Sequence, residues 1–195
     1  MRRCILVAWV VLSGLTGPGP ERASQSGKLP AADNVVEIKT YVSRAPVPRG
    51  SAFEVAVVAK VLPKFHVNAN KVLQDYLIPT ELEFDLPKGF QLIALHYPQG
   101  KLKKFSFSPE RLNVYEGRFK LRMKVRAEKD APLGKQTWGF SLRYQACNDE
   151  LCLPPVRIPV LVELETALVD AKSKSLYPGI FQERYPPPVT RPREP

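Results

Sequence analysis

Hydrophobic and charged residues alternate along the middle of this chain, and the segment "GRFKLRMKVR" (117–126) shows the pattern most clearly. Successive side chains of a β-strand point to opposite faces of the sheet. The segment is therefore predicted to be a strand with one apolar and one cationic face. The apolar face consists of Phe119, Leu121, Met123 and Val125. The cationic face consists of Arg118, Lys120, Arg122, Lys124 and Arg126.

Six other segments follow the same period of two, with turn-forming residues between them. They are "VVEIKTYV" (35–42), "AFEVAVVAKV" (52–61), "TELEFDL" (80–86), "FQLIALHY" (90–97), "TWGFSLRYQA" (137–146) and "VRIPVLVEL" (156–164). Only residues 166–176 have a pattern compatible with a helix. Seven to nine short strands without a long helix predict an all-β fold, an antiparallel β-sandwich of two sheets, and a barrel fits the same pattern.

Composition and the two ends of the chain divide it into three parts. Hydrophobic residues make up 44% and charged residues 25%, which is typical of a soluble globular domain, here assigned to residues 33–165. The initial "MRR" and the apolar residues 5–15 predict a signal peptide over residues 1–26, with a retained membrane anchor as the alternative. The proline-rich residues 172–195 are predicted to be a flexible tail. We therefore expect an exported protein, in the periplasm or an equivalent compartment.

Two cysteines lie close together in "RYQACNDELCLPP" (143–155). The "NDEL" between them is a polar turn sequence, so Cys147 and Cys152 are expected at the two ends of a short hairpin loop, within bonding distance. Paired cysteines of exported proteins are usually bonded. If Tyr144 and Ala146 face inward and the alternation continues, Cys147 faces outward, where another protein's thiol can reach it.

The spacing leaves the role of this cysteine pair open. Closing so short a loop stabilises a fold by only about 2 kcal/mol in the chain-entropy model, whereas thiol–disulfide exchange requires only an accessible pair. A redox centre and a structural disulfide are therefore both retained. A metal site that adds His66 and His96 is disfavoured, because this spacing is not a strong metal signature. We expect no metal and no cofactor.

The cationic face of residues 118–126 and the formal net charge of +10 favour an acidic protein partner or an anionic surface. The simpler interpretation is a solvated face that pairs across the sheet with Glu81, Glu83 and Asp85. Nucleic-acid binding is disfavoured in an exported chain that has no recognisable binding motif. We expect a monomer.

Three segments resemble one known family. They are "YQACNDELCLPP" (144–155), "FHVNANKVLQDYLIPTELEF" (65–84) and "KKFSFSPERLNVYEGRF" (103–119), and they are similar to the N-terminal periplasmic domain of DsbD thiol:disulfide interchange proteins. The likeness extends over about residues 35–162. The resemblance implies an immunoglobulin-like sandwich that carries a cysteine-bearing hairpin.

The resemblance also implies an activity for Cys147 and Cys152, which would cycle between dithiol and disulfide. A membrane-embedded donor would reduce the pair, and the pair would then reduce thioredoxin-like exported proteins, including those of cytochrome c biogenesis. Because the chain has no C-x-x-C motif, we expect the donor to be a separate protein. The alternative is a non-catalytic immunoglobulin-like binding module with a structural disulfide in a redox or cytochrome c assembly system.

The resemblance further suggests which side chains surround the pair. "FHVN" is a candidate for the neighbourhood of the hairpin, with packing or turn structure as the alternative. The aromatic "FSF" is a candidate cover for the cysteines, with Phe107 favoured over Phe105, and burial of both rings in the core is the alternative. Asp149 and Glu150 are expected to raise the thiol pKa and to restrain spontaneous reaction. The expected surround consists of Phe65, His66, Asn68, Phe107, Tyr144, Asp149 and Glu150.

Overall fold

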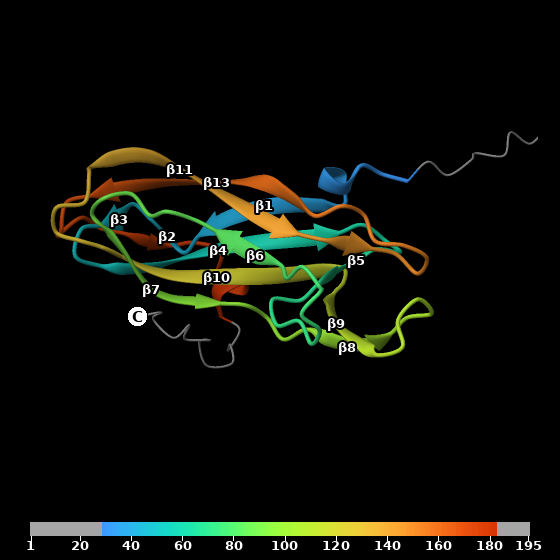
Figure 1. The fold of residues 1–195 in the computed structure, drawn as a ribbon. Coiled ribbons are helices and arrows are strands. Elements are labelled where there is room, and N and C mark those ends of the chain that lie inside the picture. The colour runs from blue at the N-terminus through green and yellow to red at the C-terminus, as the bar shows by residue number, and fades with distance from the viewer. Residues whose placement is uncertain (1–28, 183–195) are drawn as a thin grey trace, which may run out of the picture.

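The computed structural model describes residues 29–182 and shows two four-stranded sheets packed against each other (Figure 1). The first sheet has the order β1 (Val36–Val42), β4 (Ala52–Val61), β10 (Arg118–Ala127) and β7 (Phe90–His96). The second has the order β3 (Val47–Pro48), β13 (Val156–Ala167), β11 (Gly134–Tyr144) and β6 (Glu81–Glu83). All of these pairs are antiparallel except β3–β13. The predicted all-β, immunoglobulin-like sandwich is confirmed.

The core lies between the inner faces of the two sheets. Trp138 of β11 is 2% exposed and contacts the rings of Phe53 and Phe90, at centroid distances of 6.0 and 4.7 Å. Phe53 and Phe90 belong to β4 and β7, so these contacts join the second sheet to the first. The alternation predicted for β10 is confirmed, because its apolar residues belong to the same buried cluster as Trp138.

A third, smaller sheet extends the sandwich at one end. Its strands are β12 (Ala146–Cys147), β5 (His66–Asn68), β9 (Arg111–Tyr115) and β8 (Lys101–Lys104). Figure 1 shows β5, β8 and β9 gathered at the end of the molecule where the second sheet finishes. This third sheet carries the cysteine hairpin and is the part of the fold that positions the candidate site.

The C-terminal part differs from the sequence prediction. Residues 166–176 are not a helix, because the ladder between β11 and β13 continues until Thr166 lies opposite Gly134. The first residues assigned to the flexible tail fold back on the sandwich: β14 (Lys174–Ser175) pairs with β2 (Arg44–Ala45), and α1 (Pro178–Phe181) follows. The remaining helical element is η1 (Ala32–Asn34), and within residues 29–182 no helix is long and apolar enough to cross a membrane.

The predicted cross-strand pairing of the cationic face with Glu81, Glu83 and Asp85 is wrong. Strand β6 belongs to the opposite sheet and pairs with β11, whereas β10 lies between β4 and β7. Glu81 pairs with Arg143 at 3.4 Å, and Glu83 pairs with Arg157 at 2.7 Å. Periodicity identified the charged faces but could not identify the strands that lie beside them.

The cationic face is covered in part by the C-terminal segment. Lys120 donates a hydrogen bond of 2.7 Å to the carbonyl of Ile180. Arg122 forms an ion pair with Glu54 and lies 5.9 Å from the centre of the Phe181 ring. Two of the five predicted surface cations are therefore held by contacts within the domain.

Candidate functional site

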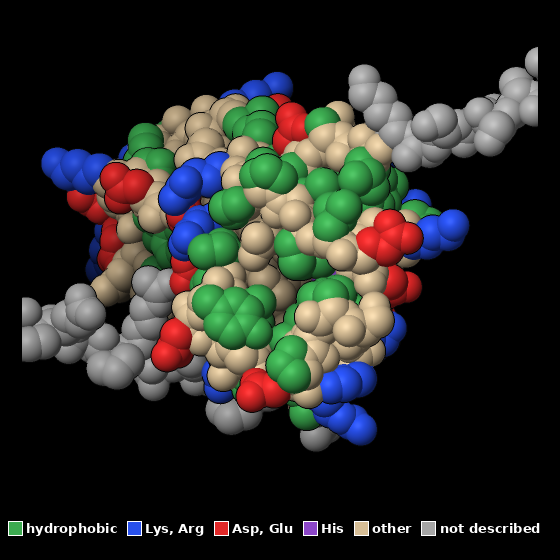
Figure 2. All heavy atoms as spheres, turned by 45° about the vertical axis from the view of Figure 1, so that its right-hand side comes forward, with side chains coloured by type: hydrophobic (Ala, Val, Ile, Leu, Met, Phe, Trp, Pro, Cys, Tyr) green, Lys and Arg blue, Asp and Glu red, His purple; other side chains and the backbone are tan. Residues whose placement is uncertain are grey.

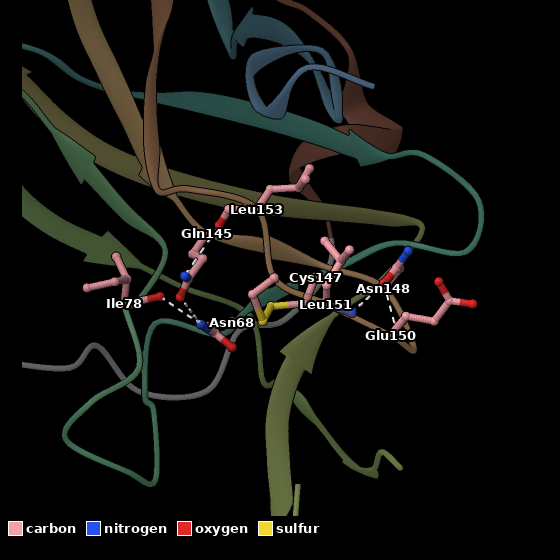
Figure 3. Close-up of a disulfide and its surroundings, with 9 residues drawn as sticks. Asn68, Ile78, Gln145, Cys147, Asn148, Glu150, Leu151 and Leu153 are labelled. Atoms are coloured by element: carbon pink, nitrogen blue, oxygen red, sulfur yellow. Dashed lines mark hydrogen bonds between the residues drawn. A yellow bond between two sulfur atoms is a disulfide. The ribbon is translucent and has the colours of Figure 1, made fainter. Parts of the chain in front are cut away.

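The cysteine pair lies in a hairpin that departs from the second sheet. β11 pairs with β13 up to Tyr144, and after Gln145 the chain pairs with β5 instead, which places Cys147 opposite His66. Cys147 and Cys152 are joined by a disulfide on either side of the turn (Figure 3). The prediction that the two cysteines lie at the two ends of a hairpin loop is therefore confirmed.

The turn is closed by hydrogen bonds to a single asparagine. The side-chain oxygen of Asn148 accepts from the backbone N–H groups of Glu150 and Leu151, at 2.9 and 2.8 Å. The backbone N–H of Asn148 also donates to the Leu151 carbonyl at 2.9 Å. An asparagine side chain that bonds to the backbone two and three residues later stabilises a tight turn, so this loop keeps its shape through contacts other than the disulfide.

The two cysteines differ in exposure. Cys147 is 0% exposed, whereas Cys152 is exposed to solvent. The expectation that Cys147 faces outward is wrong, because β12 does not continue the β11–β13 ladder. Ala146 and Cys147 are both buried in the third sheet, where β12 pairs with β5. Cys152 is therefore the cysteine that an incoming thiol meets first.

Asn68 connects the base of the hairpin to two other segments. It is fully buried, and its side-chain N–H groups donate to the carbonyl of Ile78 at 3.0 Å and to the side-chain oxygen of Gln145 at 3.5 Å. The hydroxyl of Thr80 donates to the Asn68 carbonyl at 2.6 Å. Figure 3 shows Asn68 between Ile78 and the disulfide-bearing hairpin. The sequence reasoning missed Gln145, although this residue lies within the "YQAC" segment that carries the family resemblance.

Aromatic side chains cover the third sheet next to the cysteines. The ring of Phe105 stacks on His66 at a centroid distance of 4.1 Å, and Phe107 stacks on Phe105 at 5.4 Å. Between them, the Ser106 hydroxyl donates to the Asp149 carbonyl at 3.0 Å, which ties residues 105–107 to the hairpin loop. We call residues 105–107 the aromatic cover. Phe105 is its buried member, at 7% exposed, and Phe107 is its outer member, at 39%.

The remaining predicted surround residues lie in two places. Phe65, Asp149 and Glu150 line a cleft beside the hairpin, together with His66 and Phe105. Tyr144 is directed elsewhere, since its hydroxyl donates to the Ala32 carbonyl at 2.7 Å. Burial raises the pKa of Tyr144 to about 12, so this phenol stays protonated and holds the N-terminal segment in place.

The cleft has charges of both signs. Four cations, Lys60, Lys64, Lys103 and Arg118, line it together with the carboxylates Glu116, Asp149 and Glu150. Lys103 and Glu116 form an ion pair at 2.5 Å. Figure 2 shows hydrophobic side chains gathered on this end of the molecule, with charged side chains around them.

In residues 29–182, no three His, Cys, Asp or Glu side chains are grouped so that they could hold a metal ion.

Burial controls the protonation of His66. Desolvation lowers the pKa of this imidazole from 6.5 to about 4, although the carboxylates of Glu116 and Asp149 oppose the change. The lysine at position 103 lowers the pKa further. At neutral pH the third sheet therefore contains a neutral histidine directly across from Cys147.

Comparisons with known proteins identify the family of this chain. The model of the family described as the thiol:disulfide interchange protein DsbD, N-terminal, matches residues 39–163. The chain belongs to this family, and its described part is a thiol:disulfide interchange domain. A similar solved structure is the Neisseria meningitidis DsbD N-terminal domain in the reduced form, with 16% sequence identity and a TM-score of 0.39 over 69% of this chain and 88% of that one. No curated protein matches the chain.

The buried neutral His66 predicts how stability depends on pH. In the unfolded chain this imidazole takes up a proton near pH 6.5, whereas in the folded domain it stays neutral down to about pH 4. The unfolded state therefore binds more protons in this interval, and the free energy of unfolding should fall as the pH falls from 6.5 to 4. Chemical denaturation of the oxidised domain at several pH values measures the dependence.

The variant His66→Phe should lose this contribution, because phenylalanine does not titrate. His96→Phe is the matched control and should keep the contribution of His66 to the pH dependence of stability. If wild type and His66→Phe have the same pH dependence between pH 6.5 and 4, the assignment of a neutral buried His66 is wrong.

Proposed function

We propose that this domain relays electrons by thiol–disulfide exchange through Cys147 and Cys152, from a membrane-embedded donor to oxidised thioredoxin-like exported proteins. The observation that carries the proposal is the asymmetry of the pair: an exposed Cys152 is bonded to a Cys147 that is 0% exposed. Such a pair presents one sulfur to a partner and keeps the other nearby to complete the exchange.

The exchange consists of two balanced displacement steps. A donor thiolate attacks Sγ of Cys152, the internal S–S bond breaks, and its electron pair leaves on Sγ of Cys147, which takes up a proton. The donor's second thiol then loses its proton and attacks the mixed disulfide, which releases Cys152 reduced and the donor oxidised. Delivery to an oxidised partner follows the same steps in reverse, with Cys152 as the attacking thiolate and Cys147 as the resolving one.

A purely structural role for this disulfide has a weaker physical basis. A bond that closes a loop between residues 147 and 152 contributes about 2 kcal/mol in the chain-entropy model. The fold already has a continuous core that joins both sheets through Trp138. The loop is also closed by Asn148 without the disulfide.

The loop carboxylates support controlled reactivity. Asp149 and Glu150 lie next to the pair in the chain and line the adjoining cleft. A nearby negative charge disfavours a thiolate, so we infer that these two residues keep the Cys152 thiol largely protonated until a partner is bound. Phe107 and Leu151, which are 39% and 37% exposed, offer that partner an apolar contact beside Cys152.

The proposal extends to the location and boundaries of the domain. We propose an exported, periplasmic monomer whose domain begins near residue 33 and extends past the predicted boundary at 165, since β13 ends at Ala167 and β14 pairs with β2. The predicted signal peptide at 1–26 and most of the predicted tail at 172–195 lie outside the described residues. Contact with an anionic surface or an acidic partner is assigned to the exposed cations of β10. These are Arg118, Lys124 and Arg126.

The first experiment is a redox titration of the exported domain in glutathione or dithiothreitol buffers, read by thiol alkylation. We expect a reversible two-electron couple between about −200 and −270 mV, in the range of exchange proteins. A disulfide that resists reduction until the domain unfolds would indicate a structural disulfide in a binding module and would overturn the relay.

The burial asymmetry predicts different reactivity for the two cysteines. Cys147→Ser leaves the exposed thiol of Cys152, which should react with an aromatic disulfide reagent several-fold faster than the buried thiol left by Cys152→Ser. The rates are measured at one pH on folded protein, and both variants in denaturant serve as the control for intrinsic reactivity. Equal rates in the folded state, or a faster Cys152→Ser variant, would contradict the assignment of Cys152 as the attacking residue.

The position of the aromatic cover predicts an effect on the rate at which the disulfide is reduced, and none on its reduction potential. Phe107→Ala removes the outer ring, so dithiothreitol should reduce the pair several-fold faster while the reduction potential stays the same. Leu102→Ala is the control, since Leu102 is 55% exposed on β8 of the same small sheet. An unchanged rate in Phe107→Ala would show that Phe107 does not shield the cysteines.

A further inference from the structure

His66 and Cys147 are direct cross-strand partners. They lie opposite each other in the antiparallel pair of β5 and β12. Side chains of directly opposed residues lie on the same face of a sheet, with Cβ atoms about 5 Å apart. The imidazole of His66 is therefore an immediate neighbour of the buried sulfur. One face of its ring is covered by Phe105, at 4.1 Å between ring centres.

The imidazole has an unused nitrogen in the oxidised form. His66 is 2% exposed, and within the described residues its Nε2 atom is buried without a hydrogen-bond partner. Asn68, which follows on the same face of β5, also has a buried side-chain oxygen without a partner in this part of the chain. Most buried polar atoms in proteins are hydrogen-bonded, and leaving one unpaired is unfavourable.

Reduction of the disulfide can supply the hydrogen-bond partner that His66 Nε2 lacks. A disulfide sulfur has no proton and is only a weak acceptor, so the bonded Cys147 offers little to a neighbouring polar group. A reduced cysteine has an S–H group that can donate. A neutral imidazole has one nitrogen that accepts a hydrogen bond. Burial, aided by the charge of Lys103, keeps His66 neutral at pH 7 despite the charges of Glu116 and Asp149.

We propose that His66 is a positioning residue for the cysteine pair, whose Nε2 accepts a hydrogen bond from the Cys147 thiol once the disulfide is reduced. The inference rests on the proposed exchange function. When a donor thiolate attacks Cys152, the S–S electron pair passes to Cys147 Sγ, this sulfur takes a proton from solvent, and the new S–H group binds to Nε2. The hydrogen bond exists only in the dithiol form, so His66 makes the pair easier to reduce.

The test compares reduction potentials of the wild-type domain and three variants. His66→Phe keeps an aromatic ring against Phe105 but removes the acceptor. Loss of one buried hydrogen bond should shift the equilibrium about ten-fold towards the disulfide, which is about 30 mV more negative for this two-electron couple. His66→Gln retains an acceptor and should recover part of the shift. His96→Phe, on β7, should leave the potential unchanged.

A second measurement separates this role from simple packing. Free energies of unfolding are determined for the oxidised and the reduced forms of wild type and His66→Phe at pH 7. The inference predicts that His66→Phe loses stability in the reduced form and little or none in the oxidised form. The ¹⁵N signal of His66 Nε2 should also move on reduction of the wild type, because its lone pair becomes engaged.

The possible outcomes distinguish the two proposals. A reversible couple whose potential is the same in wild type and His66→Phe would leave the exchange function intact and overturn the role of His66. Equal stability losses in both redox forms would likewise reduce His66 to a packing residue. A disulfide that is reduced only on unfolding would overturn the exchange function, and the role of His66 with it.

Discussion

The exchange of strand partners after Tyr144 is the constraint on which the rest of the site depends. As far as Tyr144, β11 is held by β13 and β6 in the second sheet. Two residues later, β12 is held by β5, which belongs to a different sheet. This change places Cys147 in a buried position, while the turn brings Cys152 back at the surface. One change of backbone pairing thus produces two cysteines with different access to solvent.

The third sheet places polar side chains where a sandwich normally has apolar ones. His66 and Asn68 are both buried, and each leaves one polar atom without a partner in the described structure. Such positions destabilise the fold, so stability alone does not explain them. They lie beside a bond whose reduction creates two S–H donors. The hydrogen bond proposed between the reduced Cys147 and His66 would give the unpaired imidazole nitrogen a partner.

The sequence was sufficient to predict the strands and the cysteine hairpin. It was not sufficient to predict which side chains of the site are buried or which strands lie side by side. Period-two patterns depend on local geometry, so the inner face of β10 could be predicted residue by residue. The orientation of Cys147 could not, because alternation assumes that a strand keeps its partner. The partners of Glu81 and Glu83 depend on which strands meet, which no local pattern contains. Phe105 and Phe107 lie two positions apart, so periodicity could not show that Phe105 is the buried one.

The contacts that hold the fold lie apart from the disulfide that we propose to react. The core contacts of Trp138 lie between the two large sheets, outside the hairpin. The hairpin base is held by a hydrogen bond of 2.8 Å from the Leu153 N–H to the Ala146 carbonyl, and by the turn at Asn148. None of these bonds requires the disulfide. Reduction can therefore leave both sulfurs close together, and this proximity is what allows the second thiol to resolve a mixed disulfide before the partner dissociates.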